Sequence, residues 1–159
     1  MMSVDASPED ITARIVLLAP DITGVVSGFV DVQDDTPLTT ALPSASLPAL
    51  GVTLGRVLDY SSPTPSWASL TQEYILFLYV LYLGETPRAY TEAEYLEVSG
   101  YQISLLTFWQ QHRRLQNADA GIVFNVDAQP DGIPRRTVRY RAHFLGLVVR
   151  LRVTTHHLY

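Results

Sequence analysis

The sequence predicts an α+β fold in which an antiparallel β-sheet is flanked by two main helices. Apolar and polar side chains alternate with period two in several segments, which is typical of half-buried strands. Two helix-start patterns, at Ser7 and at Thr91, precede stretches whose apolar residues recur at helical spacing. With 159 residues, 47% of them hydrophobic and 17% charged, the chain is expected to form a single domain over residues 1–159.

The first predicted helix begins after Ser7, whose hydroxyl can cap it. A proline at the first helical position and two following acidic residues both favour a helix start. Ile11, Ile15 and Leu18 recur at helical spacing, so they are predicted to face the core. The segment 22–32 that follows is rich in β-branched residues and is predicted to be extended.

The strongest strand pattern covers residues 72–83, Q-E-Y-I-L-F-L-Y-V-L-Y-L. Both of its alternating faces are apolar, so this strand is expected at the centre of the sheet with both faces covered. Weaker strand patterns occupy residues 48–60 and 120–128. The second of these precedes a Pro-Asp-Gly turn signal and is expected to pair antiparallel with the last strand of the chain.

The second predicted helix begins at Thr91, which forms a capping-box pattern with Glu94, and is expected to continue to about Leu115. Gly100 lies inside it and costs about 1 kcal/mol of helix stability relative to alanine. The apolar side of this helix is predicted to comprise Leu96, Ile103, Leu106, Phe108 and Trp109.

Two segments, 31–47 and 61–70, are rich in Asp, Thr, Ser or Pro and are predicted to be extended loops or arms. A long connection without secondary structure usually has a function of its own. We therefore expect the first segment to act as an arm that contacts a neighbouring copy. Trp67, in the second segment, is a candidate for either a buried anchor or a subunit contact.

The last long apolar stretch, 137–154, is predicted to be one strand with an apolar face and a basic face. After Phe144 the alternation shifts by one residue, and Gly146 at this shift suggests a bulge or a bend. The basic face is predicted to comprise Arg139, Arg141, Arg150 and Arg152. These arginines either lie at a solvated edge or meet acidic residues of a neighbouring copy.

Charge is unevenly distributed along the chain, whose net charge is −5. Residues 1–104 hold three arginines against 13 acidic residues, and residues 105–159 hold eight arginines against three aspartates. A molecule with an acidic part and a basic part can pair head to tail with copies of itself. Asp34 and Asp35, in the long acidic loop, are candidates for the partners of the basic face. Binding of an anionic polymer is an alternative that the modest basic excess favours less.

No catalytic, cofactor or metal site is predicted. The chain has no cysteine, and its four histidines lack the spacing of metal ligands. It contains no nucleotide-binding glycine motif and no nucleophile motif. Its apolar runs are shorter than the roughly 18 residues needed to cross a bilayer, and its N-terminal residues do not resemble a secretory signal.

The order of these elements resembles that of the tail terminator, or tail completion, proteins of long-tailed bacteriophages. The resemblance covers residues 8–154. It rests on the short first helix, L-P-A-L-G-V-T-L at 47–54, the aromatic strand at 74–83, the second helix, and the closing V-R-Y-R-A-H-F-L-G-L-V-V-R-L-R-V. The loops at 31–46 and 61–70 depart from the family pattern, so no interface residue is transferred from the family.

The resemblance implies a structural, non-enzymatic virion protein, assembled in the host cytoplasm, that forms a hexameric ring at the neck. Its implied partners are other copies of itself, the tail tube protein and the head–tail connector or stopper protein. DNA would pass through the lumen of the ring without sequence-specific binding. The candidate interface residues are those inferred from charge and aromatic character: Arg139, Arg141, Arg150, Arg152, Asp34, Asp35 and Trp67.

Two alternatives remain open. The chain could be a head-side stopper or adaptor, or a tail tube subunit, in which the region 31–70 would supply the long hairpin that lines a tube. It could instead be a non-viral α+β domain that binds a small molecule in its aromatic interior. This last alternative predicts a closed pocket with convergent polar groups.

Overall fold

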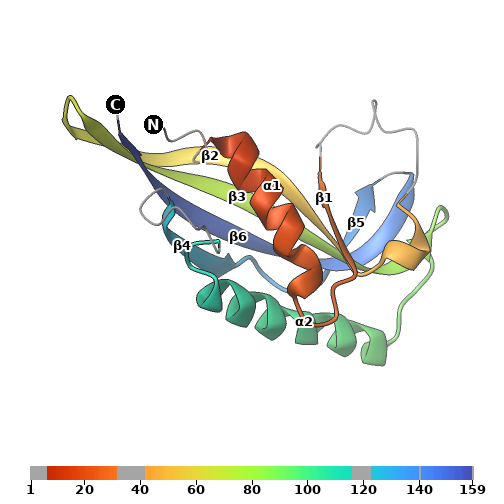
Figure 1. The fold of residues 1–159 in the computed structure, drawn as a ribbon. Helices are drawn as coiled ribbons and strands as arrows, with labels where there is room; N and C mark the ends of the chain where they lie inside the picture. Colours follow the sequence, from red (N-terminus) through yellow and green to blue (C-terminus); the bar gives the residue numbers. More distant parts are fainter. Residues whose placement is uncertain (1–6, 32–41, 116–122, 140, 159) are drawn as a thin grey trace.

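The computed structural model describes residues 7–31, 42–115, 123–139 and 141–158. Within these ranges the chain forms a mixed α+β fold with a six-stranded, mostly antiparallel sheet and two α-helices (Figure 1). The strand order is β1-β2-β3-β6-β4, and β5 also pairs with β6. The coarse α+β prediction is therefore confirmed.

Two long antiparallel hairpins build most of the sheet. In the first, β2 (Ala49–Thr64) turns tightly into β3 (Trp67–Gly84). The first arm of the second hairpin consists of two strands in succession, β4 (Val123–Pro130) and β5 (Arg135–Arg139). Both pair antiparallel with the same edge of β6 (Ala142–Leu158), which forms the returning arm. Strands β3 and β6 pair antiparallel along nearly their whole length and join the two hairpins.

Strand β3 is central, between β2 and β6, as predicted. Both of its faces were expected to be covered, but the two helices cover only one of them. The short strand β1 (Ser27–Val30) extends the sheet parallel to β2 and covers only part of the predicted segment 22–32. The predicted antiparallel pairing of 120–128 with the last strand is confirmed by β4 and β6.

The segment 61–70 is not a loop, which corrects the prediction. Thr64 ends β2 and Trp67 begins β3, so only two residues form the turn. This part of β2 lies beyond its short pairing with β1, and its outer edge is unpaired among the described strands. Proline has no N–H to donate, and it is tolerated at such an edge because no neighbouring strand there requires a donor.

The stretch 137–154 is not a single strand either. The chain reverses after Arg139, and Arg141 adopts a φ of 61° in the turn that leads into β6. The register irregularity predicted at Gly146 is present, but the additional residue is Val80 in β3. A side chain at Gly146 would collide with the carbonyl oxygen of Leu78, so glycine allows β3 and β6 to approach closely here.

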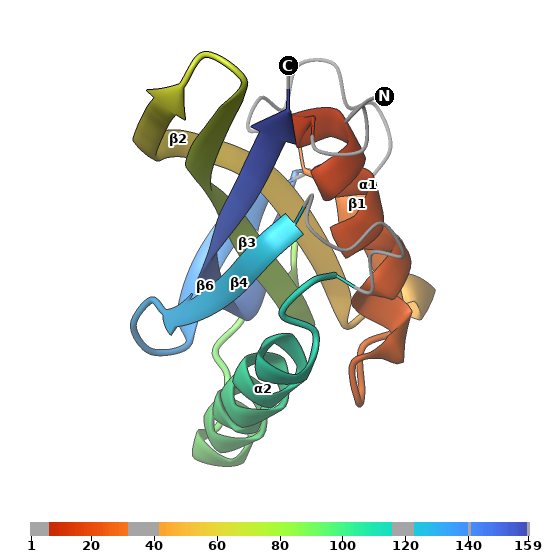
Figure 2. The same ribbon diagram turned by 60° about the vertical axis from the view of Figure 1, so that its left-hand side comes forward.

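The two helices, α1 (Pro8–Leu18) and α2 (Glu92–Gln111), pack against the same face of the sheet (Figures 1 and 2). Both predicted caps are confirmed: the Ser7 hydroxyl accepts a hydrogen bond from the Asp10 N–H, and Thr91 and Glu94 form a capping box. Two short 3₁₀ turns, Ala19–Asp21 and Ser44–Ser46, lie outside these elements.

Helix α2 differs from its prediction in two ways. It ends at Gln111, four residues before the predicted end. Its buried residues are Val98, Leu105, Phe108 and Trp109. Leu96 and Ile103, which were predicted to face the core, are 59% and 73% exposed. The prediction of the apolar side is therefore wrong for these two residues.

The opposite face of the sheet, which we call the open face, is covered by neither helix. At one end of the molecule the second hairpin curls out of the plane, so that the end of β5 approaches the end of β1 (Figure 1). A second, small core fills this curl. It consists of Tyr79, Ala142 and Phe144, with Phe29, Leu42, Leu47 and Phe77 packed against it.

Candidate functional site

A buried polar network closes the curled end of the sheet. The Arg139 guanidinium donates to Asp31 Oδ1 at 2.7 Å, and the Tyr79 hydroxyl donates to Asp31 Oδ2 at 2.6 Å. Asp31 is 1% exposed and Arg139 is 8% exposed. The network therefore links β5, at one edge of the sheet, to the residue that follows β1 at the other edge.

The aromatic ring of Tyr79 is held between the rings of Phe29 and Phe144, at centroid distances of 6.0 and 5.3 Å. Burial, followed by the hydrogen bond to Asp31 and its charge, raises the pKa of Tyr79 well above its ordinary value. Burial alone lowers the pKa of Arg139, but the hydrogen bond to Asp31 and its charge outweigh burial and raise it. Tyr79 thus stays neutral and Arg139 stays charged at every ordinary pH.

The structure corrects the predicted placement of Arg139. This residue points into the protein, while its neighbour Val138 is exposed. The turn after Arg139 explains the difference, because β5 and β6 run in opposite directions and do not continue one pattern of alternation. Arg141 is exposed, but it lies in that turn and not on a strand face, which corrects its predicted placement.

Arg150 lies on the open face and is already paired within its own chain. Its guanidinium contacts Glu73 Oε1 at 2.8 Å and Asp131 Oδ2 at 3.1 Å. Glu73 is buried, so this pair supplies the partner that a buried carboxylate requires. Arg150 thus lies on the basic face as predicted, but it has acidic partners in its own chain, and its predicted contact with a neighbouring copy stays a prediction.

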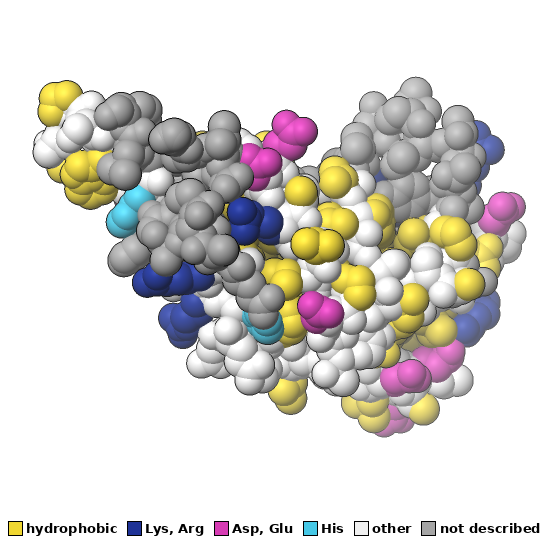
Figure 3. Space-filling view, in the orientation of Figure 1, with side chains coloured by type: hydrophobic (Ala, Val, Ile, Leu, Met, Phe, Trp, Pro, Cys, Tyr) yellow, Lys and Arg dark blue, Asp and Glu magenta, His cyan; other side chains and the backbone are white. Residues whose placement is uncertain are grey.

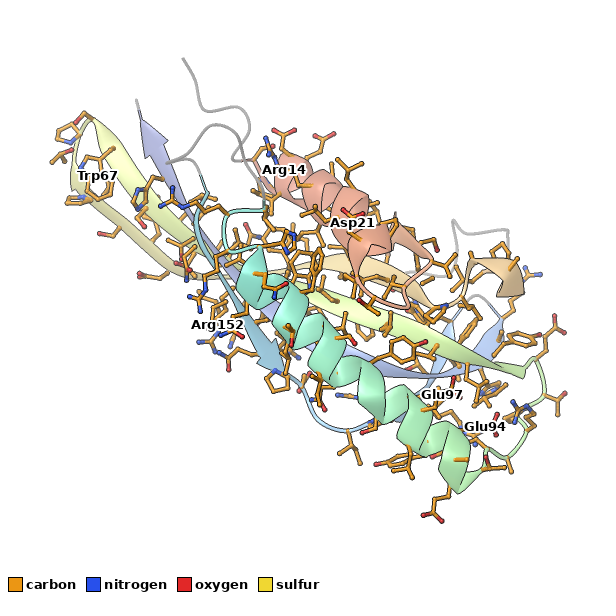
Figure 4. The ribbon with its side chains drawn as sticks, turned by 60° about the horizontal axis from the view of Figure 1, so that its bottom comes forward. Arg14, Asp21, Trp67, Glu94, Glu97 and Arg152 are labelled. Carbon is orange, nitrogen blue, oxygen red and sulfur yellow. The ribbon has the colours of Figure 1, made fainter. Side chains whose placement is uncertain are left out.

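Arg152 shares the open face with Arg150 but is exposed, and the described residues offer it no ion pair. Trp67 is half-buried at the tip of the first hairpin, with its ring 5.4 Å from that of His156. Figure 4 places Trp67 and Arg152 toward the same end of the molecule. Asp34 and Asp35 lie outside the described residues. Of the predicted interface residues that the structure describes, Arg139 and Arg141 lie near the turn that leads into β6, whereas Arg152 and Trp67 lie toward the other end of the molecule.

The difference between Arg150 and Arg152 gives a testable contrast. Arg150→Gln is expected to lower the free energy of unfolding by about 1–2 kcal/mol, because Glu73 keeps a buried charge without its cation. Arg152→Gln is expected to change it by less than about 0.5 kcal/mol. Urea denaturation of both variants measures the difference. Equal destabilisation would show that the Arg150–Glu73 pair has no structural role.

Two exposed apolar surfaces were not predicted from the sequence. The first, which we call the β2 strip, comprises Val30, Leu54, Val57 and Tyr60, each between 51% and 58% exposed. At one end it borders a hollow of about 460 Å³ lined by Pro8, Glu9, Thr12, Ala13, Val30 and Leu54. In Figure 3, hydrophobic side chains gather at the centre of the face that carries α1.

Register irregularities in β2 explain why the strip was missed. Leu54, Val57 and Tyr60 are three residues apart, which fits neither face of a regular strand. The register shifts between Leu54 and Val57 and again before Asp59. Each shift restores the apolar side chain to the helix-bearing face of the sheet. The three-residue spacing of apolar residues across Gly55 is the signal that could have revealed it.

The second surface, which we call the α2 stripe, comprises the apolar side chains of Leu96 and Ile103, with Gly100 between them and Thr107 beyond. These residues are spaced by four, three and four positions, so they form one line along α2. All four are exposed, and nothing lies within 4 Å of the position where a side chain at Gly100 would begin. The stripe therefore faces away from the sheet.

Comparison with known proteins gave no match, since neither a protein-family model nor a curated protein matches this chain. Among the described residues, no three potential metal ligands cluster. No helix in the described part of the chain is long and apolar enough to span a membrane.

Proposed function

We propose that this chain is a structural protein of a bacteriophage virion, a tail terminator that forms a ring on the tail tube and joins it to the head. The observation that carries the proposal is the presence of two separate exposed apolar surfaces, the β2 strip and the α2 stripe, on one small chain. Rings are built from heterologous contacts, in which two different patches of identical copies meet. A chain with two distinct unpartnered patches suits this mode of association.

The architecture supports the same proposal. The resemblance noted in the sequence implies an antiparallel sheet with flanking helices, and the chain has a mostly antiparallel six-stranded sheet and two helices. The first hairpin extends beyond both helices (Figures 1 and 2). Such an arm can reach a neighbouring layer of the particle, which we propose to be the tail tube protein on one side or the connector on the other.

A tail tube subunit is the second candidate, and the first hairpin is the observation that favours it. A tube subunit needs a long hairpin to line the lumen, and β2 and β3 together span Ala49 to Gly84. A head-side stopper or adaptor would use the same surfaces at a different position. In each case the ring would surround DNA without reading its sequence.

The small-molecule alternative receives less support from the structure. Tyr79 packs against Phe29 and Phe144, and Trp109 is fully buried in the main core. The aromatic interior of the described part is thus filled by the protein's own side chains. The hollow beside the β2 strip is open to solvent and lined mainly by apolar groups.

Electron microscopy of phage particles whose genome encodes this chain tests the proposal. We expect one ring of the chain per particle, at the junction of head and tail, identified by labelling with a specific antibody. Many stacked rings would identify a tube subunit instead. A well-folded chain that never associates with particle components would overturn the proposal. Genes for a tail tube and a head connector beside its own gene would add independent support.

A further inference from the structure

We propose that the six residues before Ser7, M-M-S-V-D-A, add a further strand to the sheet, antiparallel to β2, and cover the β2 strip. Residues 1–6 lie outside the described part of the chain. This strand is a property of the single chain and does not depend on the proposed ring. Any partner of the strip, a neighbouring copy included, must displace the strand before it can bind there.

The outer edge of β2 has room for a further strand. Strand β1 pairs with β2 only from Ala49 to Val52, and beyond that point the described residues give this edge no strand partner. An edge whose backbone N–H and C=O groups are unpaired is a template for an additional strand. Exposed Leu54, Val57 and Tyr60 lie beside this edge, so an added strand would also shield apolar side chains from water.

The course of α1 directs the preceding residues toward this edge. Val16, near the end of α1, lies against Gly28, whose partner in β2 is Leu50. Pro8, at the start of α1, lines the hollow together with Leu54. Helix α1 therefore runs opposite to β2, and the chain that precedes it leads toward the tip of the first hairpin (Figures 1 and 2).

Backbone conformation and length suit a strand at this place. Ser7 caps α1 and is itself extended, with φ −66° and ψ 152°. Six extended residues span about 20 Å, at roughly 3.3 Å per residue. The strip runs over the same six intervals, from Leu54 to Tyr60, and its bulges shorten it slightly. A strand of this length therefore covers the strip from end to end.

The six residues alternate as a half-covered strand requires. Met2, Val4 and Ala6 are apolar, and the two positions between them are polar. We place Val4 opposite Val57, with Met2 directed toward Tyr60. The apolar side of the added strand then lies over the strip, and its polar side faces away.

Charge favours the same register. Arg56 is exposed, and the described residues offer it no ion pair. In an antiparallel pair, residues directly opposite each other are side-chain neighbours on one face. When Val4 is opposite Val57, Asp5 is opposite Arg56. The only charged residue of the segment thus meets the cation at the free edge.

Paired cysteines test this register, because the chain has no cysteine of its own. Val4→Cys with Val57→Cys is equilibrated at high dilution with glutathione buffers, and the intramolecular disulfide is measured by mass spectrometry. Val57 is exposed, so folding is expected to be retained. We expect an effective thiol concentration about tenfold above that of a control pair, because the strand holds the two thiols side by side.

The control pair is Val4→Cys with Asp59→Cys. Asp59 is equally accessible from the N-terminal segment but, by register, lies on the opposite face of the sheet. Equal effective concentrations in the two pairs would overturn the proposed strand.

Hydrogen exchange in the full chain tests the cover without cysteines. Val4→Asp is expected to raise the exchange rate of β2 amides between Leu54 and Tyr60 by about tenfold, because it sets a charge on the apolar strip. Ser3→Asp adds the same charge to the outer side of the strand, and a change below about twofold is expected. Equal effects of the two variants would overturn the proposal, as would outward β2 amides that are unprotected in the unchanged chain.

A charge exchange tests the pairing of Asp5 with Arg56. Arg56→Asp is expected to lower the effective concentration of the Val4 and Val57 thiols several-fold, and adding Asp5→Arg is expected to restore it. A double variant no better than Arg56→Asp would overturn the assigned register. All of these measurements use the dilute, purified chain. A protected strand in a chain that is absent from particles would remove the virion role alone, and a particle-bound chain without the strand would remove this inference alone.

Discussion

Asp31→Ala is expected to lower the free energy of unfolding by about 3–5 kcal/mol, because it removes the buried carboxylate that pairs with the buried Arg139 guanidinium. The Tyr79 hydroxyl loses its acceptor at the same time. Because this contact joins β5 to the residue after β1, beside the small aromatic core, the expected loss includes some of the packing of that core. Urea denaturation followed by circular dichroism measures the change.

The double replacement Asp31→Leu with Arg139→Met is expected to cost much less than either single change. A buried ion pair is strongly destabilised when one partner is lost, but it can be replaced as a whole by apolar side chains of similar size. Arg88→Ala provides the control, because Arg88 and Glu94 form an exposed pair, and exposed ion pairs contribute little to stability. Equal costs for Asp31→Ala and Arg88→Ala would contradict the structural role of the buried network.

Gly146→Ala is expected to lower the free energy of unfolding by about 3 kcal/mol. Its new methyl group would overlap the carbonyl of Leu78, so β3 and β6 must move apart at this position. Gly100→Ala is the matched control, and it is expected to raise the free energy of unfolding. Nothing lies near that position, and alanine favours a helix by about 1 kcal/mol over glycine. Thermal unfolding of both variants tests the pair, and a stable Gly146→Ala protein would contradict the close approach.

The helix starts could be predicted because each depends on a few neighbouring residues. Ser7 and Thr91 cap the helices through side-chain hydrogen bonds to backbone groups three residues later, and such contacts require no knowledge of the rest of the fold. The central position of β3 followed from its two apolar faces for the same reason. These features were confirmed with little change.

The turn after Arg139 could not be predicted, because its sequence carries no turn signal. Neither glycine nor proline is present at 139–142, and the alternation of apolar and basic residues continues across it. Arg141 adopts a positive φ that non-glycine residues seldom use. Tertiary contacts, among them the Asp31–Arg139 pair, therefore select a turn that local preference does not indicate.

The candidate interface could be predicted only in outline. Asymmetry of charge along the chain indicated head-to-tail association, and that hypothesis remains untested. The residues chosen for it were less informative, since Arg139 and Arg150 have partners in their own chain. Exposed Leu96 and Ile103 were assigned to the core because periodicity shows that a helix has an apolar line but does not show which side packs inward.

Electron microscopy of the purified chain at high concentration, with image averaging, tests the central proposal of head-to-tail assembly most directly. The proposal predicts closed rings in which each copy contacts its two neighbours through different surfaces. Two-fold symmetric dimers that bury the same surface on both copies would contradict it, because such contacts cannot continue around a ring.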